Sequence, residues 1–114
     1  MEVKSINESI FLEVMGNTPI NRILNFLDFN DYYDFSLTDI AREARVGYAT
    51  IQLFWKKLEL HDIVRQTRRV GKAKMYKLNK ENPVVRNFQN MIHEICKQET
   101  EKMFSKAHVR HVMK

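Results

Sequence analysis

Apolar residues recur at helical spacing through the first quarter of the chain. In residues 5–15 they form one face of a short helix, which we expect to end near Gly16. Thr18 and Pro19 then form an N-cap and first-turn pair, which predicts a second helix that ends before the acidic, aromatic segment 28–34. The expected inward faces are Ile6, Ile10, Phe11 and Val14 in the first helix, and Ile20, Ile23, Leu24 and Leu27 in the second.

Two further helices are predicted next, separated by a short break. Ser36 is a suitable N-cap, and Asp39 can close a capping box for a helix over residues 37–45. The pair Val46-Gly47 predicts a tight turn, and a second amphipathic helix should follow over residues 48–61. The expected inward faces are Leu37, Ile40, Ala41 and Ala44, then Ile51, Phe54, Trp55 and Leu58.

The periodicity changes from helical to alternating after Asp62. Residues 63–69 and 73–78 are predicted to be two strands joined by a turn over residues 70–72. Because side chains alternate along a strand, parity predicts two faces of the hairpin. One should carry Val64, Tyr76 and Leu78, and the other Arg65, Thr67, Arg69 and Lys77.

A final helix is predicted to start at Asn82-Pro83. Its apolar stripe is Val85, Phe88, Met91, Ile92 and Ile95. The stripe stops across residues 97–102 and resumes weakly at Met103 and Phe104. It can cover the domain's own core or pair with the same helix of a second subunit. We expect a dimer interface formed by Val85, Phe88, Ile92 and Ile95.

This order of elements defines the expected fold class. A helix, a short turn, a second helix and a two-stranded hairpin form a winged helix-turn-helix. The fold should be α+β, mostly α, with a β-hairpin wing and a long C-terminal helix. A chain of 114 residues has room for one domain and one extra element. We expect a winged-helix, DNA-binding domain over residues 1–80 and a dimerisation element over residues 81–114.

Charge is distributed unevenly along the chain. Residues 1–47 carry four Lys/Arg and eight Asp/Glu, whereas residues 48–114 carry fifteen and six. Within the predicted hairpin and its exit, residues 65–80 hold seven cationic side chains and no acid. Such a run can be an ordinary solvated surface, but like charges this dense are stabilised by an opposing row of phosphates. The pattern favours a polyanionic partner, double-stranded DNA.

The outer face of the second helix of this motif offers contacts for a DNA duplex. Gln52 can pair with adenine, Ala49 or Leu53 can touch a thymine methyl, and Thr50 and Tyr48 can bond phosphate. The expected DNA-binding residues are Tyr48, Ala49, Thr50, Gln52, Leu53, Lys56, Arg65, Arg68, Arg69, Lys72 and Lys74. An exposed Leu53 equally suits a protein partner.

Several runs resemble known regulators. Residues 46–52, with Lys56-Lys57-Leu58-Glu59 and Ile63-Val64, resemble the recognition helix and wing entry of ArsR- and MarR-type proteins. The chain more closely resembles a group of archaeal winged-helix transcriptional regulators. This resemblance lies in residues 16–19, 36–41, 68–74, 76–79 and 81–83. The resemblance covers about residues 10–95 and implies DNA binding, transcription regulation and homodimers. Asp62 stands where such proteins usually have Gly, and Asp can adopt the turn required there.

Other classes of function have little support in the sequence. One cysteine, Cys96, and scattered histidines at 93, 108 and 111 do not make a tetrahedral metal set. No phosphate loop, zinc-hydrolase motif or nucleophile elbow is present, so we expect no enzyme, catalytic residue, metal or cofactor. The lone cysteine, the missing signal peptide and the lack of a long apolar run predict a cytoplasmic protein without membrane contact.

Two alternatives to a DNA-binding regulator stay open. The winged helix can be a protein-interaction module in a larger assembly, for which a Leu53-centred apolar patch would speak. The basic hairpin can bind RNA, although exposed aromatics should then lie among its cations, and only Tyr76 lies there, pointing inward by parity. Asp28, Asp31 and Asp34 should be a solvated acidic surface, with a cation site as the alternative.

Overall fold

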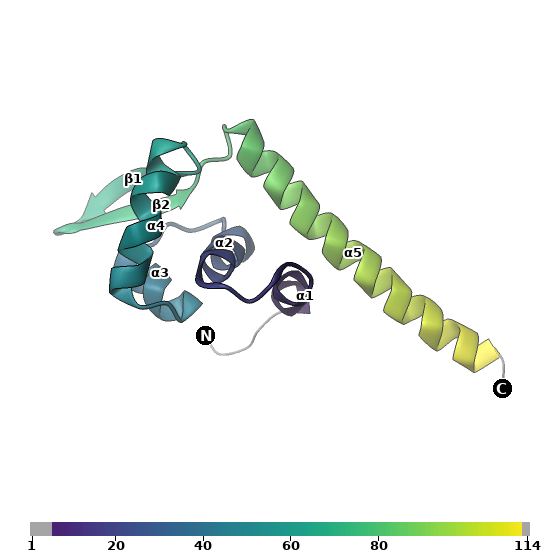
Figure 1. The fold of residues 1–114 in the computed structure, drawn as a ribbon. Helices are drawn as coiled ribbons and strands as arrows, with labels where there is room; N and C mark the ends of the chain where they lie inside the picture. Colours follow the sequence, from purple (N-terminus) through teal and green to yellow (C-terminus); the bar gives the residue numbers. More distant parts are fainter. Residues whose placement is uncertain (1–5, 113–114) are drawn as a thin grey trace.

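A computed structural model describes residues 6–112, with side chains from Ile10 to Ser105. Five helices and one hairpin follow each other in the predicted order (Figure 1). The elements are α1 (Ile6–Met15), α2 (Pro19–Phe29), α3 (Leu37–Ala44), α4 (Tyr48–Leu60), β1 (Val64–Val70), β2 (Ala73–Leu78) and α5 (Pro83–Val112). The fold is therefore the expected winged helix-turn-helix with a long C-terminal helix, and its predicted bounds are confirmed to within about two residues.

The helix starts are stabilised by the capping side chains that the sequence predicts. Thr18 Oγ1 accepts from the Asn21 backbone N–H at 3.3 Å, and Ser36 Oγ accepts from that of Asp39 at 3.1 Å. The pKa of Asp39 is lowered: partial burial alone would raise it, but hydrogen bonds from Ser36 and from the Arg42 guanidinium outweigh that effect. Each such cap contributes about 1 kcal/mol to helix stability.

The turn between α3 and α4 is built differently from the expectation of a glycine turn. Arg45 adopts the left-handed conformation (φ 58°), whereas Gly47 is the N-cap of α4 with an ordinary φ of −63°. Arg22 of α2 stabilises this strained turn, because its guanidinium donates to the carbonyls of Ala44 (3.0 Å) and Arg45 (3.2 Å). These hydrogen bonds attach the turn to α2, outside the motif.

The main core lies under the helix-turn-helix and the hairpin. Its buried residues are Ile23, Phe26, Leu27, Ile40, Ala41, Ala44, Val46, Ile51, Trp55, Val64, Tyr76, Leu78 and Val85. The rings of Trp55 and Tyr76 meet edge to face, with centroids 5.2 Å apart. Phe35 exchanges backbone hydrogen bonds of 2.9 and 2.8 Å with Tyr76, so the segment after α2 forms a bridge to β2. These contacts hold the hairpin against α4.

The hairpin contains a bulge that parity alone does not predict. Strands β1 and β2 pair antiparallel, but the register shifts between Gln66 and Arg68, so that Thr67 has no partner. The pairs Arg65–Lys77 and Arg68–Met75 consequently share the outer face, and Arg69–Lys74 lies on the inner face with Tyr76. The predicted grouping of Arg69 with Arg65 is therefore wrong. Gly71 (φ 61°) supplies the left-handed residue of the turn.

A second, smaller core joins the two ends of the chain. Ile10 and Phe11 of α1 are buried with Ile92 and Cys96 of α5, and the Phe11 and Phe88 rings meet edge to face at 5.9 Å. Val14, expected to point inward, is 51% exposed and lies outside this core. α1 lies between α2 and the middle of α5 (Figure 1).

The acidic segment after α2 is not the solvated surface that the sequence predicts. Asp28 is buried in the last turn of α2, and Gln89 of α5 donates to Asp28 Oδ1 and Asp31 Oδ2, both at 2.9 Å. Burial raises the pKa of Asp28, although Gln89 and nearby His93 oppose that rise. Asp31 also forms an ion pair with Lys80 at 2.9 Å. These acids attach α5 to the winged-helix body.

The far half of α5 extends away from the rest of the molecule, opposite the hairpin (Figure 1). Met103 and Phe104 on this part are 57% and 76% exposed. None of the helices in the described part of the chain is long and apolar enough to cross a membrane.

Candidate nucleic-acid interface

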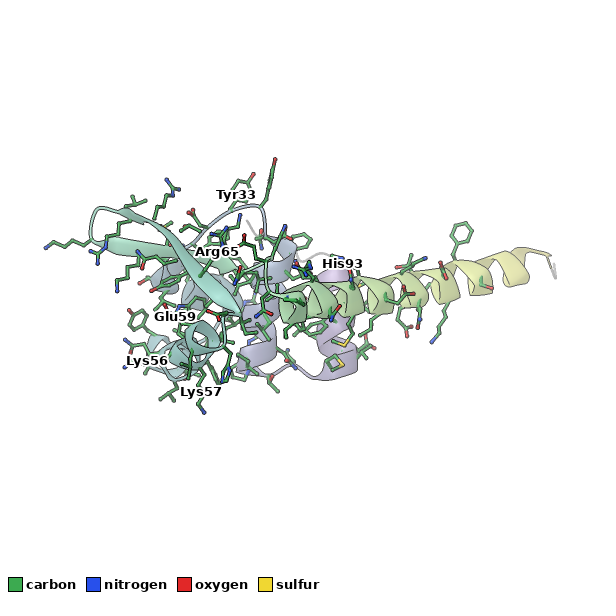
Figure 2. All side chains as sticks on the ribbon, turned by 90° about the horizontal axis from the view of Figure 1, so that it is seen from above. Tyr33, Lys56, Lys57, Glu59, Arg65 and His93 are labelled. Carbon is green, nitrogen blue, oxygen red and sulfur yellow. The ribbon has the colours of Figure 1, made fainter. Side chains whose placement is uncertain are left out.

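The residues expected to touch bases lie on the exposed side of α4. Ile51 and Trp55 dock this helix on the core, which turns the opposite side toward solvent. Tyr48, Ala49, Gln52, Leu53 and Lys56 are exposed there, and Thr50 is half-buried at the edge. Figure 2 shows Lys56 and Lys57 projecting from the outer side of α4. The polar outer face that a recognition helix needs is thus present.

The inner face of the wing meets the start of α4 in a shallow groove. The groove holds about 240 Å³ and is lined by Ser36, Leu37, Thr38, Tyr48, Lys72, Ala73, Lys74 and Tyr76. Lys72 and Lys74 therefore stand beside the first turn of α4, where Tyr48 is exposed. The bulge places Arg69 opposite Lys74 on the same face. Two cations and several hydroxyl groups consequently lie beside the N-terminus of α4, and a third cation, Arg69, lies on the same face of the wing.

This helix N-terminus is itself open to an anion. Gly47 caps α4 without any side-chain hydrogen bond, so the first N–H groups of the helix lack the partner that Ser36 supplies to α3. Unsatisfied N–H groups and the positive end of the helix dipole favour a phosphate at such a position. Together with Lys72 and Lys74, the geometry suits the backbone of a nucleic acid.

On the outer face of the wing, one cation is paired with an acid of the same chain. Arg68 donates to both carboxylate oxygens of Asp34, through Nε at 3.0 Å and Nη2 at 3.1 Å. Thr67 also donates to this carboxylate. The hydrogen bonds from Arg68 and then Thr67 lower the pKa of Asp34 to about 2. Arg68 was expected to face DNA; its charge is instead matched within the chain, because Asp34 follows a loop that returns to the hairpin.

The four residues expected at a dimer interface lie against this chain's own helices. Val85 is part of the main core and Ile92 of the smaller core, each 1% exposed. Phe88 and Ile95 are half-buried at the edge of the smaller core. The first half of the stripe therefore covers the chain's own core.

The described residues do not gather the side chains of a metal centre. Within that part of the chain, no group of three or more His, Cys, Asp or Glu is placed to hold a metal ion. The side chains of His108 and His111 lie outside the described residues. Cys96 is buried in the smaller core, and this burial raises the pKa of its thiol.

The helix-turn-helix, the hairpin wing and the long final helix together define the winged-helix class of fold. No family model matches the sequence, and no curated protein matches it as a relative. Solved structures do match: ZitR of Lactococcus lactis in complex with DNA aligns with a TM-score of 0.54 and 14% identity over 81% of this chain and 66% of ZitR. ZitR is a zinc-responsive member of the MarR family.

Two further structures show the same arrangement. MepR, a transcription regulator of the Staphylococcus aureus multidrug efflux pump MepA, aligns with a TM-score of 0.57 and 14% identity over 95% of this chain and 87% of MepR. Reduced AbfR bound to DNA aligns with a TM-score of 0.53 and 16% identity over 96% and 81%. At these identities the likeness establishes a MarR-like winged-helix fold.

Sequence reasoning missed two exposed aromatic side chains that lie beside cations of the hairpin. Tyr32 and Tyr33 line a groove with Arg65 and Lys77, although more than thirty positions separate them along the chain. Their adjacency in a polar segment was a visible signal, but their position beside the wing depends on Asp34 and Phe35. Figure 2 shows Tyr33 and Arg65 on the side of the molecule away from Lys56 and Lys57.

Proposed function

We propose that this protein is a transcription regulator that binds double-stranded DNA as a homodimer and is not an enzyme. In each subunit, α4 lies in a major groove and the inner face of the wing contacts the flanking phosphates. Base readout belongs to Gln52, Ala49 and Leu53, while Tyr48 and Thr50 bond the backbone. The closer resemblance to archaeal regulators and the cytoplasmic location stay predictions.

One observation carries this proposal: Lys72 and Lys74 stand beside the uncapped start of α4, next to its exposed polar face, and Arg69 lies opposite Lys74 on the same face of the wing. Within the described residues none of the three has an ion-pair partner. Cations without partners beside a helix N-terminus are stabilised by a row of phosphates. ZitR and AbfR, which share this fold, are crystallised with DNA.

Periodicity along α5 supports the homodimer. Val85, Ile92, Cys96 and Met103 follow each other at spacings of seven, four and seven, so they lie in one row along the helix. The first three are buried within the chain, but Met103 is 57% exposed. A second copy of α5 would continue the burial of this row. We therefore propose residues 81–114 as the dimerisation element, with Phe88 and Ile95 at the edge of the interface and Val85 and Ile92 supporting it from within.

The test of DNA binding is a salt titration with a random-sequence duplex. Affinity should fall as salt rises, with a log–log slope of about −0.9 for each phosphate neutralised. Arg69→Ala and Lys74→Ala should each make the slope shallower by about one. Lys97→Ala is the matched control, because Lys97 is an exposed cation on α5, away from the wing. Equal slopes for all variants would overturn the placement of DNA on the inner face.

The test of the dimer is the molecular mass in the same buffer. Met103→Lys should shift the protein toward the mass of one chain, because it places a charge in the proposed interface. Gln98→Lys adds the same charge on the other side of the helix and should leave the mass unchanged. If the wild-type protein has the mass of one chain at the concentration at which it binds duplex, the homodimer is wrong.

A second candidate is a winged helix that binds another protein. The observation in its favour is that Leu53 and Leu60, seven residues apart on α4, are 73% and 75% exposed. Lys56 and Lys57 lie between them, and they favour DNA over an apolar partner. The absence of duplex binding at low salt would make this protein-interaction module the better proposal.

A further inference from the structure

The outer face of the wing forms a second groove, separate from the one beside α4. It holds about 700 Å³ and lies between the segment after α2 and the two strands. Tyr32, Tyr33, Arg65, Thr67, Arg68 and Lys77 line it. The duplex proposed above contacts the inner face of the wing. The side chains that line this outer groove therefore need a separate explanation.

Two aromatic side chains in this groove are not part of any core. Tyr32 is 83% and Tyr33 64% exposed, and their rings meet edge to face with centroids 5.7 Å apart. Exposed rings lose the free energy that burial would contribute, about 25 cal/mol for each Å² left in water. A ligand with a flat apolar face would cover them.

The backbone that carries these rings is fixed on its C-terminal side. Asp34, next to Tyr33, accepts from Thr67 and from two nitrogens of Arg68. Phe35 follows and makes its two backbone hydrogen bonds with Tyr76. The loop is thereby attached to both strands of the wing, and a ligand need not pay the entropy of ordering it.

Two cations beside the rings, Arg65 and Lys77, have no ion-pair partner among the described residues. Arg65 and Lys77 are directly opposite each other across the strands, an unfavourable pairing of like charges. Asp34 is already bound by Arg68, and no acid among the described residues forms an ion pair with Arg65 or Lys77. An anionic group in the groove would relieve their repulsion.

We propose that this groove binds single-stranded nucleic acid, with unpaired bases stacked on Tyr32 and Tyr33 and the backbone phosphates on Arg65 and Lys77. Cations that follow a backbone, together with aromatic rings that stack on bases, are the usual means of holding single strands. A duplex would not use these rings, because its base faces are covered by their neighbours. The site is thus a second nucleic-acid surface on the opposite face of the wing, and it supplies the exposed aromatics whose absence from the hairpin sequence argued against RNA.

The experiment measures fluorescence anisotropy of labelled twelve-residue oligo-dT and oligo-U on the full chain. Tyr32→Ala and Tyr33→Ala should each weaken binding about tenfold, whereas Tyr32→Phe and Tyr33→Phe should bind as wild type, because phenylalanine keeps the stacking face. Arg65→Ala/Lys77→Ala should weaken binding and its dependence on salt. Tyr32, Tyr33 and Arg65 are exposed and Lys77 is half-buried, so circular dichroism should show an unchanged fold.

As the matched control, the variants of each face of the wing are tested with the ligand proposed for the other face. The Ala variants of the tyrosines should keep their affinity for duplex, and Arg69→Ala/Lys74→Ala should keep most of its affinity for the oligonucleotides. Preference for oligo-U or oligo-dT identifies RNA or DNA as the natural strand, and either supports the site. The proposal is overturned if neither oligonucleotide binds, if the Ala variants bind like wild type, or if duplex displaces the oligonucleotide one for one. Loss of duplex binding alone would instead overturn the proposed regulator and leave this site supported.

Discussion

The winged-helix body, residues 19–78, and the pair formed by α1 and α5 are packed to different extents. Thirteen buried residues make the main core, which draws on α2, α3, α4 and both strands and includes Val85 at the start of α5. Among the side chains described, Ile10 to Ser105, four buried residues make the core between α1 and the middle of α5. Because stability follows the apolar area removed from water, the body should hold its shape alone, whereas the pair depends on its few contacts.

Besides the apolar contact of Val85, the attachment between these two regions includes polar contacts. Gln89, buried on α5, bonds two acids at the end of α2, and Lys80 pairs with one of them. Hydrogen bonds demand defined distances and angles, so this attachment sets the direction of α5 more strictly than apolar contact would. The surface proposed to contact DNA and the helix proposed to form the dimer are therefore supported by two different cores. The hydrogen bonds of Gln89 join these two cores and set the direction of α5.

The largest expected effect is in the body. Trp55→Ala removes a buried ring that packs edge to face on Tyr76, and it should lower the free energy of unfolding by about 3–5 kcal/mol. Urea denaturation measures the change. Leu53→Ala, on the exposed side of the same helix, should change it by less than about 0.5 kcal/mol. Similar losses in the two variants would contradict the assignment of the inner and outer sides of α4.

A smaller effect is expected in the α1–α5 pair. Ile92→Ala should lower the free energy of local unfolding of this pair by about 2–4 kcal/mol, because it opens a cavity in the core that contains Phe11 and Cys96. Amide hydrogen exchange should speed up in α1 and the middle of α5 while α3 and α4 stay protected. Met91→Ala, at the neighbouring exposed position, is the control. If protection fell equally in the body, the two regions would be one cooperative unit.

The preference for one duplex sequence over another should depend on residues of the winged-helix body. Gln52→Ala should reduce the preference for the best duplex sequence by about 1–3 kcal/mol, because one bidentate contact to a base is lost. Lys56→Ala should instead weaken binding evenly across sequences, as expected of a phosphate contact. Competition binding against a duplex library measures both. An even loss on replacing Gln52 would move base readout to other residues.

The smallest effects should appear in the pH dependence of stability, with opposite signs for two carboxylates: Asp34, which attaches to the wing, and Asp28, which attaches to α5. The pKa of Asp34 is lowered to about 2, so its contribution is complete above about pH 4 and is lost as the pH falls toward 2. The pKa of Asp28 is raised by burial, so its contribution is complete below the usual carboxyl range and is lost as the pH rises through the folded-state pKa.

Thermal unfolding from pH 2 to 7 checks these signs. Asp34→Asn should flatten the profile on its acid side, and Asp28→Asn should flatten it above about pH 4. Each variant serves as the other's control, because the two carboxylates titrate in different ranges. A loss of stability on acidification from pH 6 to 4 that disappears in Asp28→Asn would show that the sign for Asp28 is wrong.

Local pattern was enough to predict the elements, and distance along the chain explains what it missed. Ser36 and Thr18 signal helix starts through contacts three residues away, which a sequence displays directly. Asp34 meets Arg68 across 34 positions, and Asp28 meets Gln89 across 61. Nothing in the local pattern of an acidic loop distinguishes a solvated carboxylate from one with a distant partner. The two regions themselves are therefore predictable, and their attachment is not.

The candidate site also has one part that the sequence predicts and one part that it does not. The exposed side of α4 follows from helical periodicity once Ile51 and Trp55 are assigned to the core. The two faces of the wing do not, because the single extra residue at Thr67 reverses the parity of every side chain from Arg68 to Val70. That reversal brings Arg69 to the face beside α4, and alternation alone had placed it on the other.

The helix α5 continues unbroken beyond the contacts that attach it to the rest of the chain. From Cys96, buried against α1, to Val112 it spans about 24 Å at 1.5 Å per residue. A tilt of about 5° would therefore displace its far end by about 2 Å. In a dimer formed through α5, such a tilt in both subunits would change the separation of the two α4 helices, measured along DNA in base pairs.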